Sequence, residues 1–348
     1  RLRTVTGVQT CALPILGVRL ECAQCHKHPT DRWTQEEYWG FANVFAQVVS
    51  TANNFSSKEL KAAVDKENNI RKERYSGRNA NNNINLVREM MVSPLTSKNK
   101  EKPNPATGNV PAPQAPGGPQ FVHESGKDTR VTLANWLTAK DNPYFARSFV
   151  NRVWAHYFGV GLVNPVDDFS VANPPTNPRL LDTLAKDFAE SGFDLRKLER
   201  RILTSRTYQL SYDDNESNKF DKNNYSHAFI RPLMAEQVVD LLNAALGVEE
   251  KFTGQEEIPS GTKMVEIGAS KLNNANLTYV LRIFGRPPRT TACDCERAME
   301  PALPQALFRM TDQTVLQKFN DQKGRVQMLI RTKTTPEDQV DELFLATL

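Results

Sequence analysis

Apolar residues recur along most of the chain at the spacing of three and four positions that is typical of amphipathic helices. The clearest case is 35–49, where Thr34 and Glu37 form a capping box at the start of an apolar stripe. Strand signals are limited to 263–267 and 278–284. The sequence therefore predicts a mainly α fold with few short strands. Further helices, with ends marked by Asp, Asn, Pro or Gly, are predicted over 129–139, 143–159, 177–192, 194–205, 234–246, 304–319 and 336–348.

The helical pattern is interrupted after the first helix. Residues 79–85 are rich in Asn, and residues 103–119 are rich in Pro and Gly. Such compositions are typical of linkers and irregular chain rather than of packed elements. We therefore predict a helical multi-domain protein in which a long irregular linker at 51–127 separates a short region at 16–50 from a helical domain at 128–348.

The N-terminal segment needs separate treatment. Residues 5–15 resemble the translation of a common sequencing-library adapter, so 1–15 is interpreted as non-native and excluded from fold reasoning. Cys11 falls in that segment. We expect the native protein to extend upstream of it, and we expect the helical domain to be truncated at the other end. The remaining cysteines are Cys22, Cys25, Cys293 and Cys295.

The overall composition changes this picture little. Of 348 residues, 39% are hydrophobic and 24% are charged, which suits a chain with a packed core. No run approaches the ~20 apolar residues of a membrane-spanning helix, so no transmembrane segment is predicted in this sequence. The net charge of +4 is small for the length, and Lys and Arg are not clustered. We therefore expect no nucleic acid partner.

The strongest chemical motif is Cys22-Ala-Gln-Cys25-His26, a C-x-x-C-H run. In c-type haem attachment the two thiols add to the haem vinyl groups, and the adjacent imidazole binds the iron. The spacing is demanding because one short turn must supply all three bonds. The motif predicts haem c as cofactor, with Cys22 and Cys25 as thioether anchors and His26 as the proximal ligand.

Two other uses of these cysteines stay open. Cys22 and Cys25 could join Cys293 and Cys295 in a zinc site, in which His26 or His28 replaces one thiolate. A C-x-x-C pair can also serve as a redox or structural dithiol. The distal haem ligand is not assigned. Candidate side chains for it are His123, His156, His227 and several methionines, each of which is more typical of a surface or core position.

Acidic residues suggest a third interpretation. Asp167 and Asp168 stand side by side in a predicted loop, and Glu296 lies in the Cys293–Cys295 loop. Such carboxylates can serve as the acid and base of a glycan-acting hydrolase, if they lie ~5 Å apart or somewhat more in an open cleft. Paired carboxylates more often cap helices or pair with arginines. The sequence therefore assigns neither a reaction nor a catalytic residue.

Longer runs resemble a known pair of domains. Residues 16–29, followed by Asp31-Arg-Trp33, resemble the end of a cytochrome-c-related domain of unknown function found in planctomycete-type bacterial proteins. The resemblance covers about 16–45 and 128–348. The partner domain that follows it in such proteins is similar to this chain at 142–147, 151–154, 164–169, 173–175, 205–208, 285–289 and 293–297.

The resemblance implies more than the residues alone. Proteins of this type are exported, so it implies a periplasmic or secreted location, where c-type haem is attached. It implies an electron-transfer or redox-accessory role with a redox partner protein, and an association with polysaccharide breakdown. The sequence departs from the family pattern at Lys27 and Thr30, where Asn and an aromatic residue are expected. Those changes leave the Cys and His positions intact.

Overall fold

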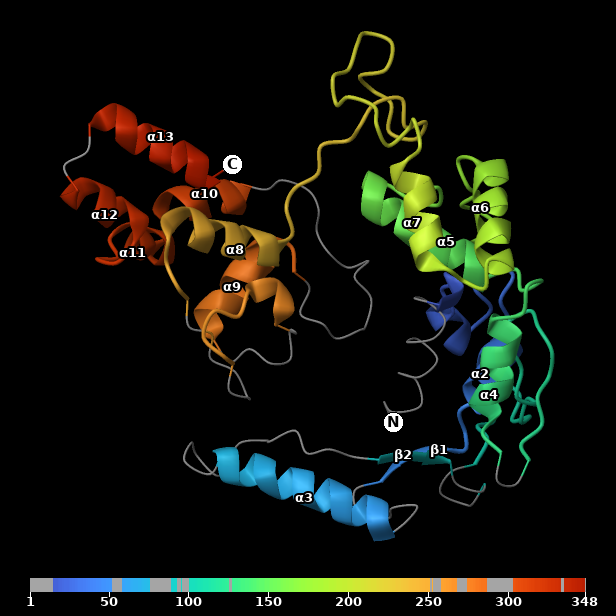
Figure 1. The fold of residues 1–348 in the computed structure, drawn as a ribbon. Coiled ribbons are helices and arrows are strands. Elements are labelled where there is room, and N and C mark those ends of the chain that lie inside the picture. The colour runs from blue at the N-terminus through green and yellow to red at the C-terminus, as the bar shows by residue number, and fades with distance from the viewer. Residues whose placement is uncertain are drawn as a thin grey trace. The chain divides into compact units, whose positions relative to one another are not determined.

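The computed structural model describes residues 15–51, 58–75, 89–92, 95, 100–124, 127–250, 252, 258–267, 274–286, 303–332 and 335–347. The chain divides into two compact units, Arg1–Ile230 and Arg231–Leu348. The described residues are mainly helical in both units (Figure 1), which confirms the predicted fold class.

The first unit contains helices and one small sheet. Its two strands, β1 (Val48–Thr51) and β2 (Glu89–Val92), are antiparallel, with Val48 opposite Val92. The 3-10 helix η2 spans Glu21–Gln24. The α-helices are α2 (Gln35–Asn43), α3 (Lys58–Tyr75), α4 (Thr129–Leu137), α5 (Phe145–Phe158), α6 (Pro178–Glu190) and α7 (Leu195–Leu203).

In the second unit, all the regular secondary structure of the described residues is helical. Its apolar core is formed by residues between 235 and 315, among which Met264 is fully buried. The helices are α8 (Ala235–Leu246), η3 (Met264–Glu266), α9 (Ala275–Ile283), α10 (Leu303–Thr311), α11 (Gln313–Phe319), α12 (Arg325–Arg331) and α13 (Pro336–Thr347).

Helix ends follow the residues that marked them in the sequence. The Thr34 hydroxyl accepts a hydrogen bond from the Glu37 amide at 3.2 Å, and the Glu37 carboxylate accepts one from the Thr34 amide at 2.9 Å. Gly159 ends α5 in the left-handed conformation, with φ of 84°. The side chains of Asp128, Asn177 and Asp194 cap α4, α6 and α7.

The predicted strands at 263–267 and 278–284 are wrong. Residues 275–283 form α9 because the Asn274 side chain caps the first turn, and because the buried Leu277, Val280 and Leu281 recur at helical spacing. At 264–266 the chain forms η3. The Asp240 carboxylate of α8 accepts hydrogen bonds from the Met264 and Val265 amides at 2.6 and 3.1 Å, which holds a turn rather than a strand.

Two predicted helices differ from the observed ones by more than a few end residues. The helix expected over 35–49 ends at Asn43, after which the chain makes tight turns and enters β1. The helix expected over 304–319 is two helices, because the Asp312 side chain accepts from the Thr314 amide at 2.8 Å and caps a new helix. At Asp312 a side-chain cap ends the continuous helix, whereas after Asn43 the chain enters turns in which the Val44 amide donates to the Phe41 carbonyl at 3.2 Å.

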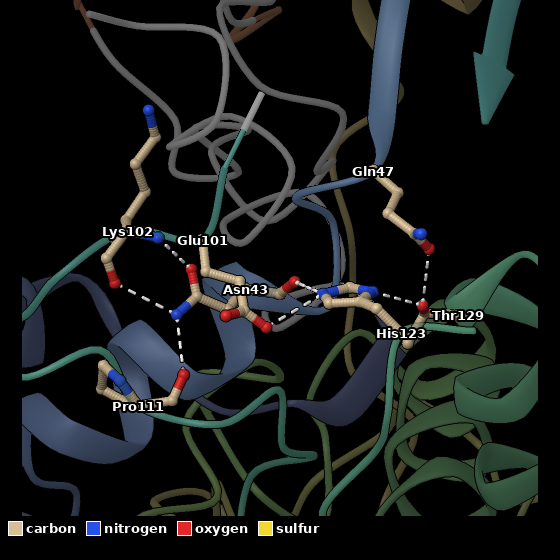
Figure 2. A network of polar contacts seen from close by, with 7 residues as sticks. All are labelled: Asn43, Gln47, Glu101, Lys102, Pro111, His123 and Thr129. Atoms are coloured by element: carbon tan, nitrogen blue, oxygen red, sulfur yellow. Dashed lines mark hydrogen bonds and ion pairs between the residues drawn. The ribbon is translucent and has the colours of Figure 1, made fainter. Parts of the chain in front are cut away.

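The predicted linker at 51–127 contains α3, β2 and a long loop at 100–124. Figure 2 shows how that loop is held. The buried Asn43 side chain donates to the Lys102 and Pro111 carbonyls at 3.1 and 2.8 Å and accepts from the Lys102 amide at 2.6 Å. The loop is therefore held against α2, where one amide side chain satisfies three of its backbone groups and the Gly40 carbonyl accepts from the Gln114 amide at 3.0 Å.

His123 closes the same polar network. Its Nδ1 lies 2.8 Å from the Thr129 hydroxyl, and its Nε2 lies 2.9 Å from the Asn43 carbonyl and 3.5 Å from Glu101 (Figure 2). The Thr129 hydroxyl in turn donates to Gln47 at 3.2 Å. Only 5% of the His123 side chain is exposed. The network joins the end of α2, the loop and the start of α4 into one structure.

Two apolar cores lie in the first unit. One joins residues 16–44 to the 115–121 loop and α4, and the other is formed by α5, α6 and α7 with Tyr225. Figure 1 shows α5, α6 and α7 close together. Among the residues that the structure describes, no helix combines the length and the hydropathy that crossing a membrane requires.

Candidate cofactor-attachment site

The motif forms a tight surface turn. We call residues 22–26 the CxxCH turn. Its first three residues belong to η2, and the Cys25 and His26 amides each lie 3.4 Å from the Cys22 carbonyl. Both thiols are free and exposed, and His26 is exposed as well, while Ala23 between them is fully buried. The turn therefore anchors itself through Ala23 and presents three reactive side chains to solvent.

The peptide between the two cysteines is held by side chains of α2. The Gln24 carbonyl accepts a hydrogen bond from the Gln35 amide at 3.1 Å and another from the Trp39 indole at 3.3 Å. Farther along, the His28 amide donates to the Trp33 carbonyl at 2.9 Å and closes the loop after the turn. The conformation of the turn thus depends on the helix that follows it.

The His26 ring is oriented by the backbone. Its Nδ1 lies 2.7 Å from the Lys27 carbonyl. A histidine that ligates iron commonly donates one ring N–H to a carbonyl and binds the metal through the other nitrogen, so this contact leaves Nε2 for a ligand. Two exposed thiols and one imidazole on a single turn are the donor set that covalent haem attachment uses. The residues present therefore fit the group that the motif predicts.

Residues before the turn are fixed to the region after 128. The Phe169 amide donates to the Gly17 carbonyl at 3.0 Å, and the Phe169 ring packs so closely that a Cβ on Gly17 would lie 2.7 Å from it. Arg19 pairs with Asp167 at 2.8 Å. After the turn, Arg32 donates to the Tyr144 hydroxyl and stacks over the Trp33 ring at 4.5 Å. The CxxCH turn is thus part of the same folded unit as α5 and the following loop that holds Asp167 and Phe169.

Asp167 serves as one side of this junction. Its side chain is 5% exposed, whereas the Arg19 side chain is 43% exposed. Burial lowers the pKa of Arg19, but the hydrogen bond to Asp167 and the carboxylates of Asp167, Asp168 and Glu21 raise it overall. This arrangement supports a structural role for Asp167. Asp168 is partly buried beside it, and Glu296 lies outside the described residues.

The described structure shows no contact between the CxxCH turn and the other candidate haem ligands, His123, His156 and His227. His123 has both ring nitrogens in the buried network, His156 is exposed beside Tyr157, and His227 packs against Phe229. Cys293 and Cys295 lie outside the described residues, so their distance from the CxxCH turn stays a prediction. Within the described residues, no group of three or more His, Cys, Asp or Glu side chains is arranged to hold a metal ion.

The supporting residues were not found from the sequence. Gln35, Trp39 and Gly17 contact the turn or its flank across turns and loops, and no motif marks them. Gln35 and Trp39 lie four positions apart at the start of α2, so they share one face of that helix. That spacing was the available signal, but it indicates a partner only once the position of the turn is known.

The fold and the turn define a class: a mainly helical protein in which a surface C-x-x-C-H turn is joined to a following helical region. Comparison with known families agrees. Residues 129–348 match PSD1, described as a protein of unknown function (DUF1553), and residues 3–50 match PSCyt2, described as a protein of unknown function (DUF1549). Because the first match spans more than half of the chain, the protein belongs to the PSD1 family. Searches of curated proteins and of solved structures each gave no match.

Both matches agree with the resemblance drawn from the sequence runs. The planctomycete cytochrome-c-related domain and its partner domain are the two families found. The PSCyt2 match begins at residue 3 and so includes all of the adapter-like residues 5–15. The boundary between the matched families falls inside the first structural unit, which ends at Ile230.

Proposed function

We propose that this protein attaches haem covalently at the CxxCH turn and acts in electron transfer or as a redox accessory. The observation that carries this proposal is the exposure of both thiols and of His26 on one anchored turn. Cys22 and Cys25 would form the thioether bonds, and His26 would supply the proximal imidazole. When bound, the haem would supply one-electron chemistry.

The chain's own residues have defined tasks in this proposal. The Lys27 carbonyl orients the His26 ring through Nδ1, which fixes the direction of Nε2. The burial of Ala23 keeps the turn from rotating its thiols inward. The segment that precedes the turn is held in place by the Arg19–Asp167 ion pair and by the contact between Gly17 and Phe169. A rigid support of this kind suits a cofactor that must present one edge to a partner.

The wider setting follows from the same proposal. C-type haem is attached outside the cytoplasm, so we propose an extracytoplasmic location and a redox partner protein that meets the exposed turn. An association with polysaccharide breakdown is proposed from the family resemblance alone. A hydrolase that uses Asp167 is less well supported, because that carboxylate is buried and paired with Arg19.

The test is covalent haem. The chain should be produced with the haem-attachment machinery, exported, purified, and examined by a pyridine haemochrome spectrum and by intact mass. We expect one haem per chain, and none in the Cys22→Ser/Cys25→Ser variant. The His26→Leu variant should keep the haem mass and the pyridine haemochrome spectrum, but the visible absorption spectrum of the folded protein should change because the iron has lost its proximal imidazole. An unchanged protein mass and no haem spectrum would overturn the proposal.

The same preparation tests the zinc alternative. Metal analysis of haem-free protein should find no stoichiometric zinc if the proposal holds. One zinc per chain, lost together with folding on chelation and dependent on Cys293 and Cys295, would instead support a structural metal site. Free thiols at all four positions together with absent haem would favour neither cofactor and would reject the proposal.

A further inference from the structure

The peptide that joins the two halves of the C-x-x-C motif is the most tightly supported part of the CxxCH turn. The Gln24 carbonyl accepts from two side chains, the Gln35 amide at 3.1 Å and the Trp39 indole at 3.3 Å. A carbonyl on a surface turn would ordinarily bind water. Here one carbonyl oxygen accepts hydrogen bonds from two donors of a single helix.

The two donors are themselves well fixed. Gln35 is the first residue of α2 and lies inside the capping box that joins Thr34 and Glu37, so its backbone cannot rotate without breaking that cap. The Trp39 ring stands edge-on to the buried Tyr38 ring, with centroids 5.3 Å apart. Each donor therefore reaches Gln24 from a position that the helix and the core already determine.

We propose that Gln35 and Trp39 are positioning residues that fix the orientation of Cys22, Cys25 and His26 by holding the Gln24 carbonyl. The inference rests on the proposed function for its purpose, because haem attachment requires both thiols and the imidazole on the same side of the turn. The contacts themselves exist without any cofactor. Their effect can therefore be measured in the haem-free chain.

Three variants separate positioning from simple stability. Gln35→Glu keeps the size of the side chain and suits a helix N-terminus, but it replaces a donor with an acceptor. Trp39→Phe keeps an aromatic ring and removes the indole N–H. Gln114→Met is the matched control, since Gln114 also donates from its side chain to a backbone carbonyl, that of Gly118 at 3.0 Å, in a different loop.

The first measurement is amide hydrogen exchange in the reduced, haem-free 348-residue chain. The Cys25 and His26 amides, which donate to the Cys22 carbonyl, should exchange about five-fold faster in Gln35→Glu and in Trp39→Phe. In the double variant that combines these two substitutions, they should exchange roughly twenty-five-fold faster. The amides of α6 should keep their wild-type rates. Gln114→Met should leave the turn unchanged.

The second measurement is covalent haem per folded chain after export with the attachment machinery. Gln35→Glu and Trp39→Phe should load less haem than Gln114→Met. If the double variant does not fold, the two single variants decide by the same comparison. Unchanged exchange at Cys25 and His26 in folded variants would overturn the inference, as would an equal increase at the turn and in α6.

The failure of this inference and the failure of the proposed function give different results. Faster exchange at the turn in a protein that never binds haem keeps the positioning role and rejects the haem proposal. Normal haem content with unchanged exchange at the turn keeps the haem proposal and rejects the positioning role.

Discussion

Two histidines of the first unit show opposite uses of the same side chain. His123 is 5% exposed, and its ring nitrogens contact the Thr129 hydroxyl and the Asn43 carbonyl. His26 is exposed, and only Nδ1 has a contact given by the described structure, to the carbonyl of the next residue. In the buried network around His123, the side chains hold the backbone in place. In the CxxCH turn the backbone is held so that side chains stay available.

Asp167 belongs with His123 in this respect. Its carboxylate is buried against Arg19 and fixes one piece of chain to another. Chemical type alone therefore does not separate a functional group from a structural one in this protein. The property that separates them is whether the polar atoms of the side chain already have hydrogen-bond or ion-pair partners.

The largest expected effect concerns Gly17, which joins the chain before the CxxCH turn to the loop that holds Asp167. Its φ is +68°, and an added Cβ would lie 2.7 Å from Phe169 Cδ2 and 3.0 Å from Ser148 Oγ. We expect Gly17→Ala to lower the free energy of unfolding by about 2–4 kcal/mol in urea unfolding, through backbone strain and overpacking.

Gly108→Ala is the matched control for that change. Gly108 has φ of +75° and nothing within 4 Å of an added Cβ, so it carries the backbone strain alone. Its loss should be smaller, about 1–2 kcal/mol. Equal losses at both positions would show that the contact between Gly17 and Phe169 does not hold the turn.

The second prediction tests the two histidines directly. His123→Leu removes contacts to the Thr129 hydroxyl and the Asn43 carbonyl in a buried site, so we expect a loss of about 2 kcal/mol in the free energy of unfolding. His26→Leu changes an exposed side chain and should stay within about 0.5 kcal/mol of wild type. Chemical unfolding of both variants measures the difference in the free energy of unfolding. Similar losses would contradict the contrast between a structural His123 and an exposed His26.

The third prediction concerns Asp167, whose substitution should cost less stability than that of His123 and more than that of His26. Asp167→Asn keeps the shape and removes the charge facing Arg19. We expect a loss of about 1 kcal/mol in the free energy of unfolding, since the 43% exposure of Arg19 lets solvent screen the pair. Asp182→Asn, which breaks the more exposed pair with Arg147, should cost less. A larger loss from Asp182→Asn in the same assay would contradict a buried role for Asp167.

The smallest effect concerns Tyr38, which packs beneath the turn. Burial, with the nearby charges of Glu21 and Cys25, raises the pKa of Tyr38 to about 12. Since a tyrosine in the unfolded chain titrates near ~10, its contribution to stability is fully present below that pH and is lost as pH rises toward about 12.

Tyr38→Phe should therefore leave stability at neutral pH almost unchanged and reduce the loss of stability between these alkaline values. Among the described residues the Tyr38 hydroxyl has no hydrogen-bond partner, so its removal breaks no bond that the structure contains. Unfolding measured across alkaline pH tests this, with Tyr225→Phe as a second buried tyrosine whose pKa is also raised to about 12. An unchanged alkaline slope in Tyr38→Phe would contradict the burial of its hydroxyl.

Local patterns predicted much of the fold. The capping box at Thr34, the side-chain caps at Asp128, Asn177 and Asp194, and the terminating Gly159 lie where the sequence placed them, because each acts through contacts within one or two turns of chain. The strand predictions failed at 263–267 and 278–284. There the apolar and β-branched residues were compatible with either state, and contacts from Asp240 and Asn274 decided it.

The sequence by itself determined the helical class, the family, and the three side chains of the CxxCH turn, since spacing along the chain is sufficient for each of these. Only the tertiary structure decided which polar side chains have hydrogen-bond or ion-pair partners within the protein. Asn43 reaches Lys102 and Pro111, Arg19 reaches Asp167, and Gln35 and Trp39 reach Gln24 across distances in sequence that no local pattern records. A buried polar atom must find a partner wherever the folded chain supplies one, and the identity of that partner depends on the packing of the whole unit.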